Sequence, residues 1–566
     1  MPWRPHKFSS PVTALGSVVI LVLISVDAPG DELPSKDEYL QPAGESPGEP
    51  ALDPAAIEAE GAVIGNIVLN NRNIFDLSNP LENKLLYRWA NRLHIVTKPH
   101  VIESQLLFEE GDTYSVRLAD ETERHLRSTS YISEADVTPV KHADGVVDLE
   151  VTTIDVWTLT PEVSLGRSGG ENRIGIGILE QNLLGRGIQI GAKYRSNVDR
   201  DSLSFKYIDD NMFSERYRLA ANYSNNSDGF SHGLSFGKPF YALDRRRAGN
   251  LTYSKGEQID QLYDLGEPVA EYNNQFEFHQ AMLGWSGGLK NDWVRRYSAG
   301  VAYSRNQFDP VPGSTLPVML IPDDREYLYP FLGFELLEDH YETTVNFDQI
   351  HRTEDRFLGT WLNFRLGYAS QSNGSSNDAW LYQAGFSKAL VTTKKTSLTL
   401  GAGLNGRWED GDAQNALLSG IARFHRRLTE NQLFFARLSG VAGKNLDIDN
   451  PVYLGGDTGL RGYPLRYQNG DSKALLTLEH RIYTNWYPFR LVHVGAAIFF
   501  DAGRTWGGSP VGAPNLGVLK DVGFGVRLGN TRSGHGKVLH LDIAFPLDGG
   551  DDIDGVQILL DAKSSF

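Results

Sequence analysis

Residues 398–405 read LTLGAGLN, and the alternation in this stretch decides the fold. Every second side chain is apolar, and the positions between them are polar or glycine. Because the side chains of a β-strand point alternately to its two faces, the stretch predicts a strand with one apolar face. The same alternation recurs at residues 188–195, 216–223 and 539–544. The sequence therefore predicts one large, mainly β domain over residues 158–566.

The polar faces of these strands separate a soluble β-sandwich from a membrane barrel. They carry charged side chains, among them Lys193, Arg195 and Arg218, which the core of a sandwich would exclude. Trp361 and Trp380 lie near strand ends, as in the aromatic girdles of membrane barrels. Since only a closed barrel satisfies its strand hydrogen bonds in lipid, we predict an antiparallel transmembrane β-barrel. Allowing about 25 residues for each strand and loop gives about 16 strands.

The totals for the chain exclude several classes of function. Its 566 residues carry a formal net charge of −17, so we expect the chain to repel nucleic acid. It has no cysteine, which rules out disulfides and thiolate chemistry. The 14 histidines show no metal-ligand spacing, and no glycine-rich phosphate loop stands between a strand and a helix. We therefore expect no metal, no cofactor and no nucleic-acid partner.

The N-terminus has the pattern of a secretory signal peptide, which we place at residues 1–28. Basic residues such as Arg4 and Lys7 precede the apolar run 14–26, and small residues follow at a position suited to cleavage. The alternative is an uncleaved anchor, but the run is shorter than the roughly 20 residues that a membrane-spanning helix needs. Residues 29–61 are acidic and rich in proline, so we predict a disordered linker there.

A different texture marks residues 62–157, which we predict to form a small α+β domain. Strand-like stretches and stretches with helical spacing follow one another in the order strand, helices, strand, strand. The expected strands are 64–75, 132–140 and 145–156, and the expected helices are 81–93, 101–108 and 118–126. Gly111 stands where the second helix needs a C-cap.

Several short motifs in this domain resemble a POTRA domain, the periplasmic module of the outer-membrane assembly and translocation superfamily. They are Val101-Ile102, Leu106-Leu107-Phe108, Glu110-Gly111-Asp112, Thr113-Tyr114-Ser115 and Leu126-Arg127. The stretch around Trp89 is additional to that pattern. The resemblance implies a periplasmic domain whose free sheet edge takes an extended client as an added strand. The alternative is a folded spacer.

The stretch YLGGDTGLRGYP at residues 453–464 resembles the signature loop of the same superfamily. That superfamily includes BamA, TamA and the transporters of two-partner secretion. In it, a long loop folds back into the barrel lumen, and its arginine binds acidic side chains of the inner wall. The resemblance implies that Asp457, Arg461, Gly462 and Tyr463 belong to such a loop.

Two acidic side chains are candidates for binding the loop arginine. Leu476 and Leu478 belong to the apolar face of one strand, so parity puts Glu479 on the opposite, lumen-facing side. The same argument puts Asp501 inside the barrel. A buried arginine needs an anionic partner for its guanidinium, so we predict that Arg461 binds Glu479 and Asp501 as a lumenal lock. The alternative is an exposed turn with an incidental arginine.

The end of the chain has the pattern of a barrel-assembly signal. Ile558, Leu560 and the final Phe566 share one face of the predicted last strand, and a terminal phenylalanine resembles the signal by which outer-membrane barrels are recognised. This implies periplasmic chaperones and the barrel-assembly machinery as partners, besides the outer-membrane lipid. The resemblance departs in one respect. BamA carries several POTRA domains and two-partner transporters usually carry two, whereas this sequence predicts one.

Two motifs of enzymes and metal proteins are present only in part. Residues 284–288 (GWSGG) have the spacing of a nucleophile elbow, but no helix is expected after them. Asp548, Asp551, Asp552 and Asp554 lack the closing glutamate of a calcium-binding EF-hand. We therefore expect no enzyme. We expect an outer-membrane barrel that helps unfolded or secreted client proteins to insert into or cross the membrane. The alternative is a passive pore or surface antigen without a client.

Overall fold

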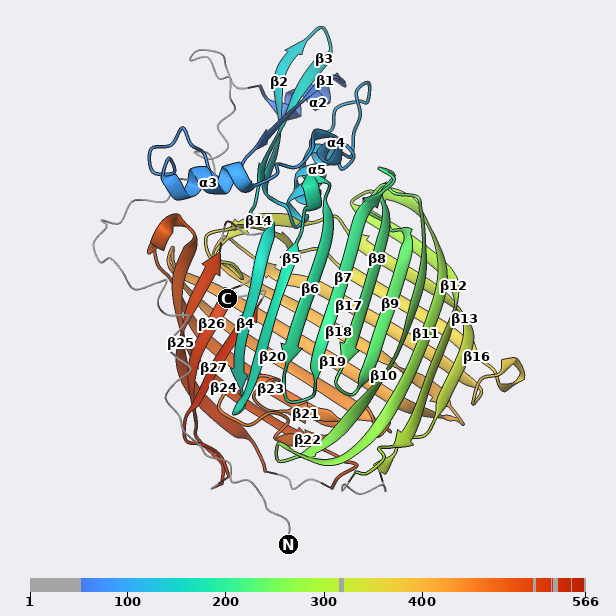
Figure 1. Cartoon of the computed structure of the whole chain (residues 1–566). Coiled ribbons are helices and arrows are strands. Elements are labelled where there is room, and N and C mark those ends of the chain that lie inside the picture. Colours follow the sequence, from blue (N-terminus) through green and yellow to red (C-terminus); the bar gives the residue numbers. More distant parts are fainter. Residues whose placement is uncertain are drawn as a thin grey trace.

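A computed structural model describes residues 52–314, 320–512, 516–530, 532, 538–550 and 552–563 of the chain. The predicted signal peptide, most of the predicted linker and Phe566 lie outside these residues. A barrel carries a small domain at one end (Figure 1). We name this end of the barrel the domain end, and the opposite end the loop end. No helix among the described residues is both long and apolar enough to cross a membrane.

The barrel is a single closed sheet in which each strand pairs with its neighbours in antiparallel register. Among the described residues it contains 20 strands. They are β4 (Leu159–Ser168), β5 (Glu171–Glu180), β6 (Ile188–Ser196), β7 (Asp201–Met212), β8 (Tyr217–Asn226), β9 (Gly229–Lys238), β10 (Arg247–Asp264), β11 (Glu267–Lys290), β12 (Trp293–Pro310), β13 (Arg325–Glu338), β16 (Trp361–Ala369), β17 (Ala379–Thr392), β18 (Thr396–Glu409), β19 (Asp412–Thr429), β20 (Gln432–Lys444), β23 (Ser472–Tyr483), β24 (Val492–Trp506), β25 (Leu519–Asn530), β26 (Val538–Pro546) and β27 (Gln557–Lys563).

The prediction of about 16 strands is wrong, because the connections are shorter than the prediction assumed. Two-residue turns join several strand pairs at the loop end, as between Ser168 and Glu171 and between Asp264 and Glu267. Gly170 and Gly266 take the positive φ angles that such tight turns require. Each strand with its turn therefore uses about 20 residues, and the same length of chain builds 20 strands.

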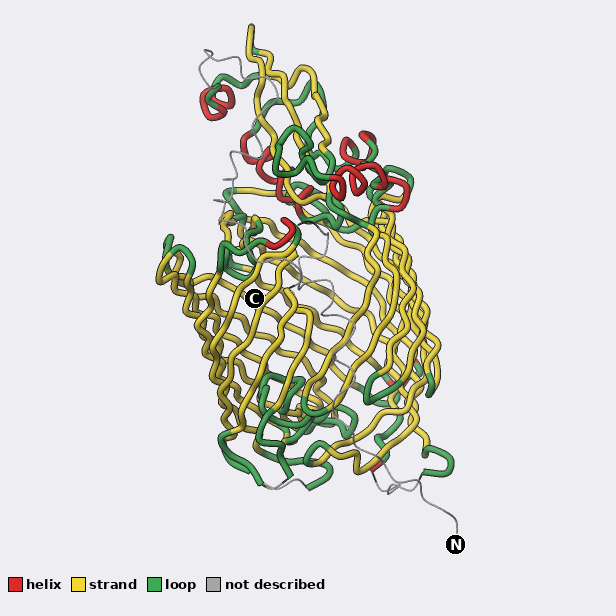
Figure 2. Tube along the Cα trace, turned by 60° about the vertical axis from the view of Figure 1, so that its left-hand side comes forward, coloured by secondary structure: helices red, strands yellow, loops and turns green. Residues whose placement is uncertain are grey.

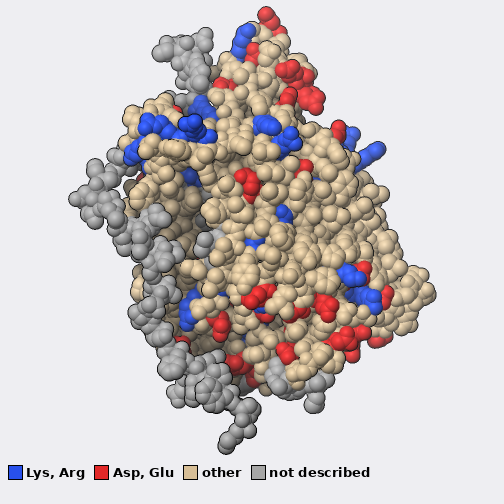
Figure 3. All heavy atoms as spheres, viewed as in Figure 1, with Lys and Arg blue, Asp and Glu red and all other residues tan. Residues whose placement is uncertain are grey.

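Apolar side chains cover the outside of the barrel, and charged side chains are buried inside it. In β25, Phe524 and Val526 are 51 % and 41 % exposed on the outer face, whereas Asp521 and Arg527 are fully buried on the inner face. This inverts the arrangement of a soluble sandwich. On the face of the barrel shown in Figure 3, charged side chains are sparse in the middle and more frequent toward the two ends. The outer face therefore suits hydrocarbon, as the alternation predicted.

The N-terminal domain is a three-stranded sheet covered by helices on one side. Its strands are β1 (Val63–Arg72), β2 (Ile132–Ala143) and β3 (Val146–Asp155), and its helices are α2 (Pro54–Ala59), α3 (Leu85–Leu93), α4 (Pro99–Glu103) and α5 (Val116–Arg127). β3 lies in the middle, parallel to β1 and antiparallel to β2. From β1 onward the order of strands and helices agrees with the sequence prediction, and α2 is an additional helix before β1. α3 begins at Leu85 and α4 ends at Glu103, so both are shorter than expected.

The last residues of the predicted linker are folded. Asp53 caps α2 by accepting a hydrogen bond from the amide of Ala55, and Pro54 begins the helix. Ile57 is buried in the core of the domain, beside residues of α4 and α5. The acidic, proline-rich composition at 53–61 therefore marks a helix start here, and this part of the linker prediction is wrong.

Two inserted segments close the barrel from its two ends. At the domain end, β14 (Tyr341–Val345) and β15 (Thr353–Phe357) form a hairpin between β13 and β16, which we name the mouth hairpin. At the loop end, residues 445–471 between β20 and β23 form the lumenal loop, with the short strands β21 (Val452–Leu454) and β22 (Gln468–Gly470). Figure 2 shows loop segments gathered across the loop end of the barrel.

Candidate functional site

Arg461 of the lumenal loop lies against the inner wall and binds two carboxylates. Its Nε and Nη2 donate to the two oxygens of Asp501 at 2.6 and 3.0 Å, and its Nη1 donates to Glu479 at 2.9 Å. All three residues are buried, with Asp501 fully so. The guanidinium also stacks on Phe499, with its central carbon 3.4 Å from the ring centroid. The buried guanidinium therefore has carboxylate acceptors for its N–H groups and an aromatic ring against its face.

Further charges on the inner wall extend this cluster. Asp542 of β26 lies 3.7 Å from Nη1 of Arg461 and forms a buried ion pair with Arg527 of β25. Arg481 donates through Nε to the second oxygen of Glu479 at 2.9 Å. Asp501, Glu479 and Asp542 therefore each have a cationic partner, which offsets the cost of burying their charges.

The two residues after Arg461 hold the loop backbone against β25 and β26. The amide of Gly462 donates to Asp521 at 3.0 Å. A Cβ at position 462 would lie 2.7 Å from the Cβ of Asp521 and 3.1 Å from the amide nitrogen of Pro546, so only glycine fits this approach. The hydroxyl of Tyr463 lies 2.8 Å from the carbonyl oxygens of Lys520 and Asp548. The three residues together dock the loop on the last strands of the barrel.

The same loop also contacts the first strands of the barrel. Arg466 forms an ion pair with Asp199 of the β6–β7 turn at 2.8 Å and lies over the ring of Tyr263 in β10. The backbone around Leu465 packs so tightly on Gly169 of the β4–β5 turn that a side chain there would clash. Asp457 does not join the Arg461 cluster, since its carboxylate faces Arg466 at 3.8 Å. The lumenal loop therefore bridges strands on both sides of the β27–β4 junction.

That junction is the weakest pairing of the barrel among the described residues. The β27–β4 ladder has one register pair, Leu560 with Arg167, whereas every other neighbouring pair has at least seven. Ile558 is half exposed on the outer face of β27, and Leu560 belongs to the same face. We name the β27–β4 junction the seam.

The mouth hairpin reaches across the domain end of the lumen. Phe347 and Ile350 at its tip are buried against Leu433, Tyr483 and Val538, which belong to β20, β23 and β26 on the far wall. The carbonyl of Phe347 accepts hydrogen bonds from Arg481 and Tyr483, both at 3.0 Å. Arg481 therefore contacts both the Arg461 cluster and the hairpin tip.

The base of the mouth hairpin binds the N-terminal domain. Arg127 of α5 donates through Nε and Nη2 to the two oxygens of Asp355, each at 2.9 Å. Arg124, one turn earlier, lies 3.5 Å from Asp339 and over the ring of Tyr341. A polar cavity of about 590 Å³ lies between α5 and the hairpin. The hairpin thus connects the domain to the inner wall.

Several titratable groups near this contact have shifted pKa values, among them Glu354 and His125. Burial raises the pKa of Glu354 in β15 to about 7, although the carboxylate accepts hydrogen bonds from the amides of Phe347 and Asp348. In α5, burial lowers the pKa of His125 to about 4, and the nearby Arg216 acts in the same direction. The charge of Glu354 therefore changes near neutral pH.

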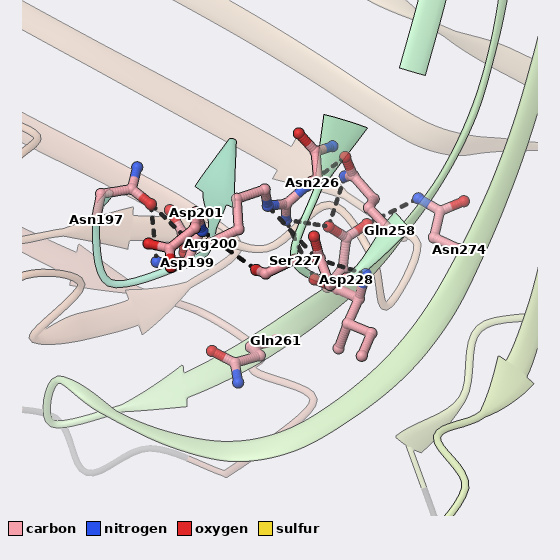
Figure 4. A network of polar contacts seen from close by, with 12 residues as sticks. Asn197, Asp199, Arg200, Asp201, Asn226, Ser227, Asp228, Gln258, Gln261 and Asn274 are labelled. Carbon is pink, nitrogen blue, oxygen red and sulfur yellow. Dashed lines mark hydrogen bonds and ion pairs between the residues drawn. The ribbon is translucent and has the colours of Figure 1, made fainter. Parts of the chain in front are cut away.

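A second polar network ties the first strands together at the loop end (Figure 4). Arg200 in the β6–β7 turn donates to Gln258 at 2.6 Å and lies 3.5 Å from Asp228 and 3.7 Å from Asp260. Asn274 of β11 donates to the same Asp260 at 2.7 Å. These contacts hold β6 to β11 as one unit beside the lumenal loop.

Sequence reasoning found part of this site and missed the rest. Parity and the loop motif pointed to Arg461, Glu479 and Asp501, which the structure brings together. Parity also places Arg481 and Asp542 on the inner face of their strands, but their contacts with Glu479 and Arg461 were not predicted. Among the described residues, no group of three or more His, Cys, Asp or Glu is placed to hold a metal ion.

The two motifs set aside in the sequence have structural places. Residues 284–288 lie within strand β11, with no helix after them. Asp548 and Asp552 face the lumenal loop. The carbonyl of Asp548 contacts Tyr463, and the carboxylate of Asp552 accepts from Tyr467 at 2.7 Å.

Comparison with known proteins gives matches among solved structures alone. No family model matches the chain, and no curated protein matches it. CdiB from Escherichia coli is 14% identical, with 88% of this chain and 76% of that chain covered and a TM-score of 0.45. CdiB from Acinetobacter baumannii is 13% identical, with 89% of this chain and 74% of that chain covered and a TM-score of 0.42. BamA from Haemophilus ducreyi lacking POTRA domains 1–3 is 15% identical, with 87% of this chain and 84% of that chain covered and a TM-score of 0.38. Over most of its length, this chain is similar to the solved structures of CdiB and BamA.

Proposed function

We propose that the protein is an outer-membrane barrel that assists client proteins to insert into or cross that membrane, with a gate at the seam. The observation that carries the proposal is the seam itself. One register pair joins β27 to β4, in a barrel whose other strand pairs are extensively bonded. Opening such a junction breaks few backbone hydrogen bonds, and it exposes two strand edges to which a client strand can pair.

The lumenal loop acts as the lock of this gate. Arg461, Gly462 and Tyr463 hold it to β23–β26 on one side of the seam, and Arg466 holds it to the β6–β7 turn on the other. A loop that is bound to both sides resists their separation. Release of either set of contacts would lower the barrier to opening, with the energy supplied by client folding.

The N-terminal domain serves as a POTRA-like docking module in the periplasm. β1 and β2 are the outer strands of its sheet. Residues 111–114 already bond to the outer edge of β1 at Ala62 and Ile64, so a client strand would pair further along β1 or with β2. Val68 of β1 is half exposed, and a client strand added there would cover it. The Arg127–Asp355 contact would then relay the docking event to the mouth hairpin.

The lumen favours this role over a passive pore. A pore that conducts steadily keeps its lumen open, whereas here an inserted segment enters the barrel from each end. The mouth hairpin buries Phe347 and Ile350 against the far wall, and the lumenal loop buries Leu460 and Tyr463. A large, steady conductance of the unmodified protein in planar bilayers would contradict the closed resting state.

A disulfide across the seam tests the proposal directly. The chain has no cysteine, so Arg167→Cys with Leu560→Cys forms a single bond across the register pair. In vesicles, we expect the oxidised double variant to lose its assistance of the folding of an unfolded barrel client, and a reductant to restore it. The matched control is Val526→Cys with Leu541→Cys, a register pair between β25 and β26. If the oxidised seam variant assists folding as well as the oxidised control does, the gate proposal is wrong.

A further inference from the structure

Helix α3 presents an apolar face that no part of the described chain covers. Leu85, Trp89 and Leu93 follow one another at intervals of four residues and therefore lie on one face of the helix. Their exposed fractions are 66 %, 55 % and 65 %. Leu86, on the same side, is 60 % exposed. Large apolar side chains in one exposed stripe indicate an interaction surface.

The opposite face of α3 fixes the helix in place. Tyr87 stacks on Phe75 at 4.5 Å between ring centroids, and its hydroxyl donates to the carbonyl of Phe489 at 2.7 Å. Asn91 donates to the carbonyl of Phe75 and accepts from its amide. Because these contacts join α3 to both the domain and the barrel, the direction of the apolar face is set by the fold.

The position of α3 matches the edge of a membrane. Figure 1 shows the helix level with the domain end of the barrel and lying across the barrel axis. Its barrel contact, Phe489, belongs to the β23–β24 turn, where Trp486 and Phe489 are 63 % and 51 % exposed. The next strand, β24, carries the outward Ile498, which is 61 % exposed. The helix and the neighbouring barrel surface therefore both expose large apolar side chains at this end of the molecule.

The charges around α3 are positive in an otherwise acidic protein. Lys84, Arg88 and Arg92 are exposed on or beside the helix, and residues 84–95 contain no acidic side chain. The nearest acidic residue before them in the chain is Glu82. It is buried and forms an ion pair with Arg532. Figure 3 shows Lys and Arg side chains gathered on this side of the molecule at the domain end. An apolar stripe bordered by cations is the pattern of a helix that lies in a phospholipid headgroup layer.

We propose that α3 lies in the headgroup region of the phospholipid leaflet next to the domain end and binds anionic lipid there. Leu85, Trp89 and Leu93 enter the acyl boundary, and Arg88 and Arg92 contact the phosphates. The inference rests on the proposed place of the barrel in the outer membrane. The helix then fixes the domain beside the wall formed by β23–β25, so that the domain stays at the membrane surface while a client binds.

Site-directed fluorescence tests the proposal in the full-length protein. Trp89→Cys and Leu93→Cys, each alone in the cysteine-free chain, accept an environment-sensitive dye in vesicles of phosphatidylethanolamine and phosphatidylglycerol. We expect a blue-shifted emission and a several-fold stronger quenching by nitroxide-labelled lipid than at Val140→Cys. Val140 is an exposed apolar residue of β2 and does not belong to α3, so it serves as the control position. Leu85→Cys is the substitute position if Trp89→Cys does not fold.

A label on the barrel separates the two proposals. Leu283 of β11 is 70 % exposed on the outer face, and a dye at Leu283→Cys is quenched if the barrel spans the membrane. Quenching at Leu283 without quenching at Trp89 and Leu93 overturns the inference about α3 alone. Absence of quenching at Leu283 overturns the membrane barrel. The dye at position 89 can also become shielded without being quenched by the labelled lipid. If that shielding increases with the amount of protein per vesicle, the face binds a second copy, and if it increases when a client is added, the face binds the client. Either result overturns the inference.

The charge requirement has its own variant. The double substitution Arg88→Gln with Arg92→Gln removes two positive charges and keeps the apolar face. With a dye at Leu93→Cys in this variant, we expect most of the quenching by nitroxide-labelled lipid to be lost when the salt concentration is raised. The parent should lose quenching in the same way when phosphatidylglycerol is replaced by phosphatidylcholine. Quenching that is unchanged in both cases would remove anionic lipid from the proposal.

Discussion

Arg461 is the residue at which the charge balance of the lumen is decided. Its guanidinium lies between Asp501 and Glu479, and each of these carboxylates is almost fully withdrawn from solvent. Attraction between opposite charges offsets the loss of hydration only while both partners are present. The site is therefore sensitive to removal of the cation.

Arg461→Ala should destabilise the barrel, because it leaves two carboxylates buried without this cation. We expect a loss of about 3–5 kcal/mol for full desolvation, and less where water enters the lumen. The measurement is the urea midpoint for unfolding of the vesicle-inserted protein. Arg461→Lys keeps the positive charge and loses the bidentate contact, so its urea midpoint should lie between those of the parent protein and Arg461→Ala. Equal midpoints for the parent and Arg461→Ala would show that the cluster adds nothing to stability.

Gly462→Ala should displace the lumenal loop without changing any charge. The added methyl group meets Asp521 and Pro546, and overpacking of this kind costs about 1–3 kcal/mol. Protease cleavage of the lumenal loop from the loop end should become faster. Gly420→Ala in β19 is the matched control, because a Cβ there has nothing within 4 Å. Similar cleavage rates for both variants would contradict the close approach.

At the scale of elements, the mouth hairpin joins parts of the chain that are far apart in sequence. Its base binds α5, and its tip binds β20, β23 and β26. A hairpin held at both ends behaves as a strut, so movement of the domain reaches the inner wall through it. Arg481 is the junction, since it binds both Phe347 of the hairpin and Glu479 of the lock.

The Arg127–Asp355 pair should couple the domain to the hairpin measurably. Both side chains are largely buried, and hydrogen bonds to charged groups contribute about 1.5–3 kcal/mol. A double-mutant cycle with Arg127→Ala and Asp355→Ala, read by thermal unfolding of the domain, should give a coupling in that range. The exposed pair Arg218–Asp210 should give less than about 1 kcal/mol in the same cycle. Equal couplings would argue against a special role for the hairpin contact.

Docking of the mouth hairpin should weaken as the pH rises. The pKa of Glu354 is raised from 4.5 to about 7 in the folded protein, so the docked hairpin binds a proton that the free hairpin releases. The stabilisation is therefore complete below pH 4.5 and is lost as the pH rises through about 7, by on the order of 3 kcal/mol at most. Conductance of bilayers should increase over this interval. In Glu354→Gln the increase should be absent, and persistence of the increase would assign it to another group.

At the scale of the whole molecule, the barrel is strong around most of its circumference and weak at one place. Strand pairs such as β10–β11 and β18–β19 are long and continuous, whereas the described part of the seam has one register pair. The lumenal loop, anchored through Arg461 on one side and Arg466 on the other, compensates for the missing ladder.

Hydrogen exchange should reveal this asymmetry. Amides of β27 and β4 should exchange much faster than those of β18 and β19, because local opening needs little bond breakage there. Arg461→Ala together with Arg466→Ala should accelerate exchange at β27 and β4 and leave β18 and β19 unchanged. Uniform acceleration over the whole barrel would mean that the loop stabilises the barrel generally and does not lock the seam.

The sequence by itself determined the local features of this protein. Alternation predicted which side chains of β18 and β26 face outward, because the period of a strand is two residues. The same parity put Glu479 and Asp501 inside, and the loop motif named Arg461. Gly145 marked the turn between β2 and β3, because it takes the positive φ angle that the turn needs. The prediction that Gly111 caps the second helix is wrong, because α4 ends at Glu103 with Ser104 as its C-cap.

The tertiary structure alone decided everything that depends on closure of the chain into a cylinder. The strand number follows from turn lengths summed over the barrel, and no local pattern reports that sum. Asp355 meets Arg127, and Phe347 meets Arg481, only because the wall curves round and brings distant strands to one mouth. The apolar period of α3 predicted a helix, but the direction of Trp89 depends on Tyr87 and Asn91 binding the opposite side. Periodicity defines a face, and only packing defines what that face meets.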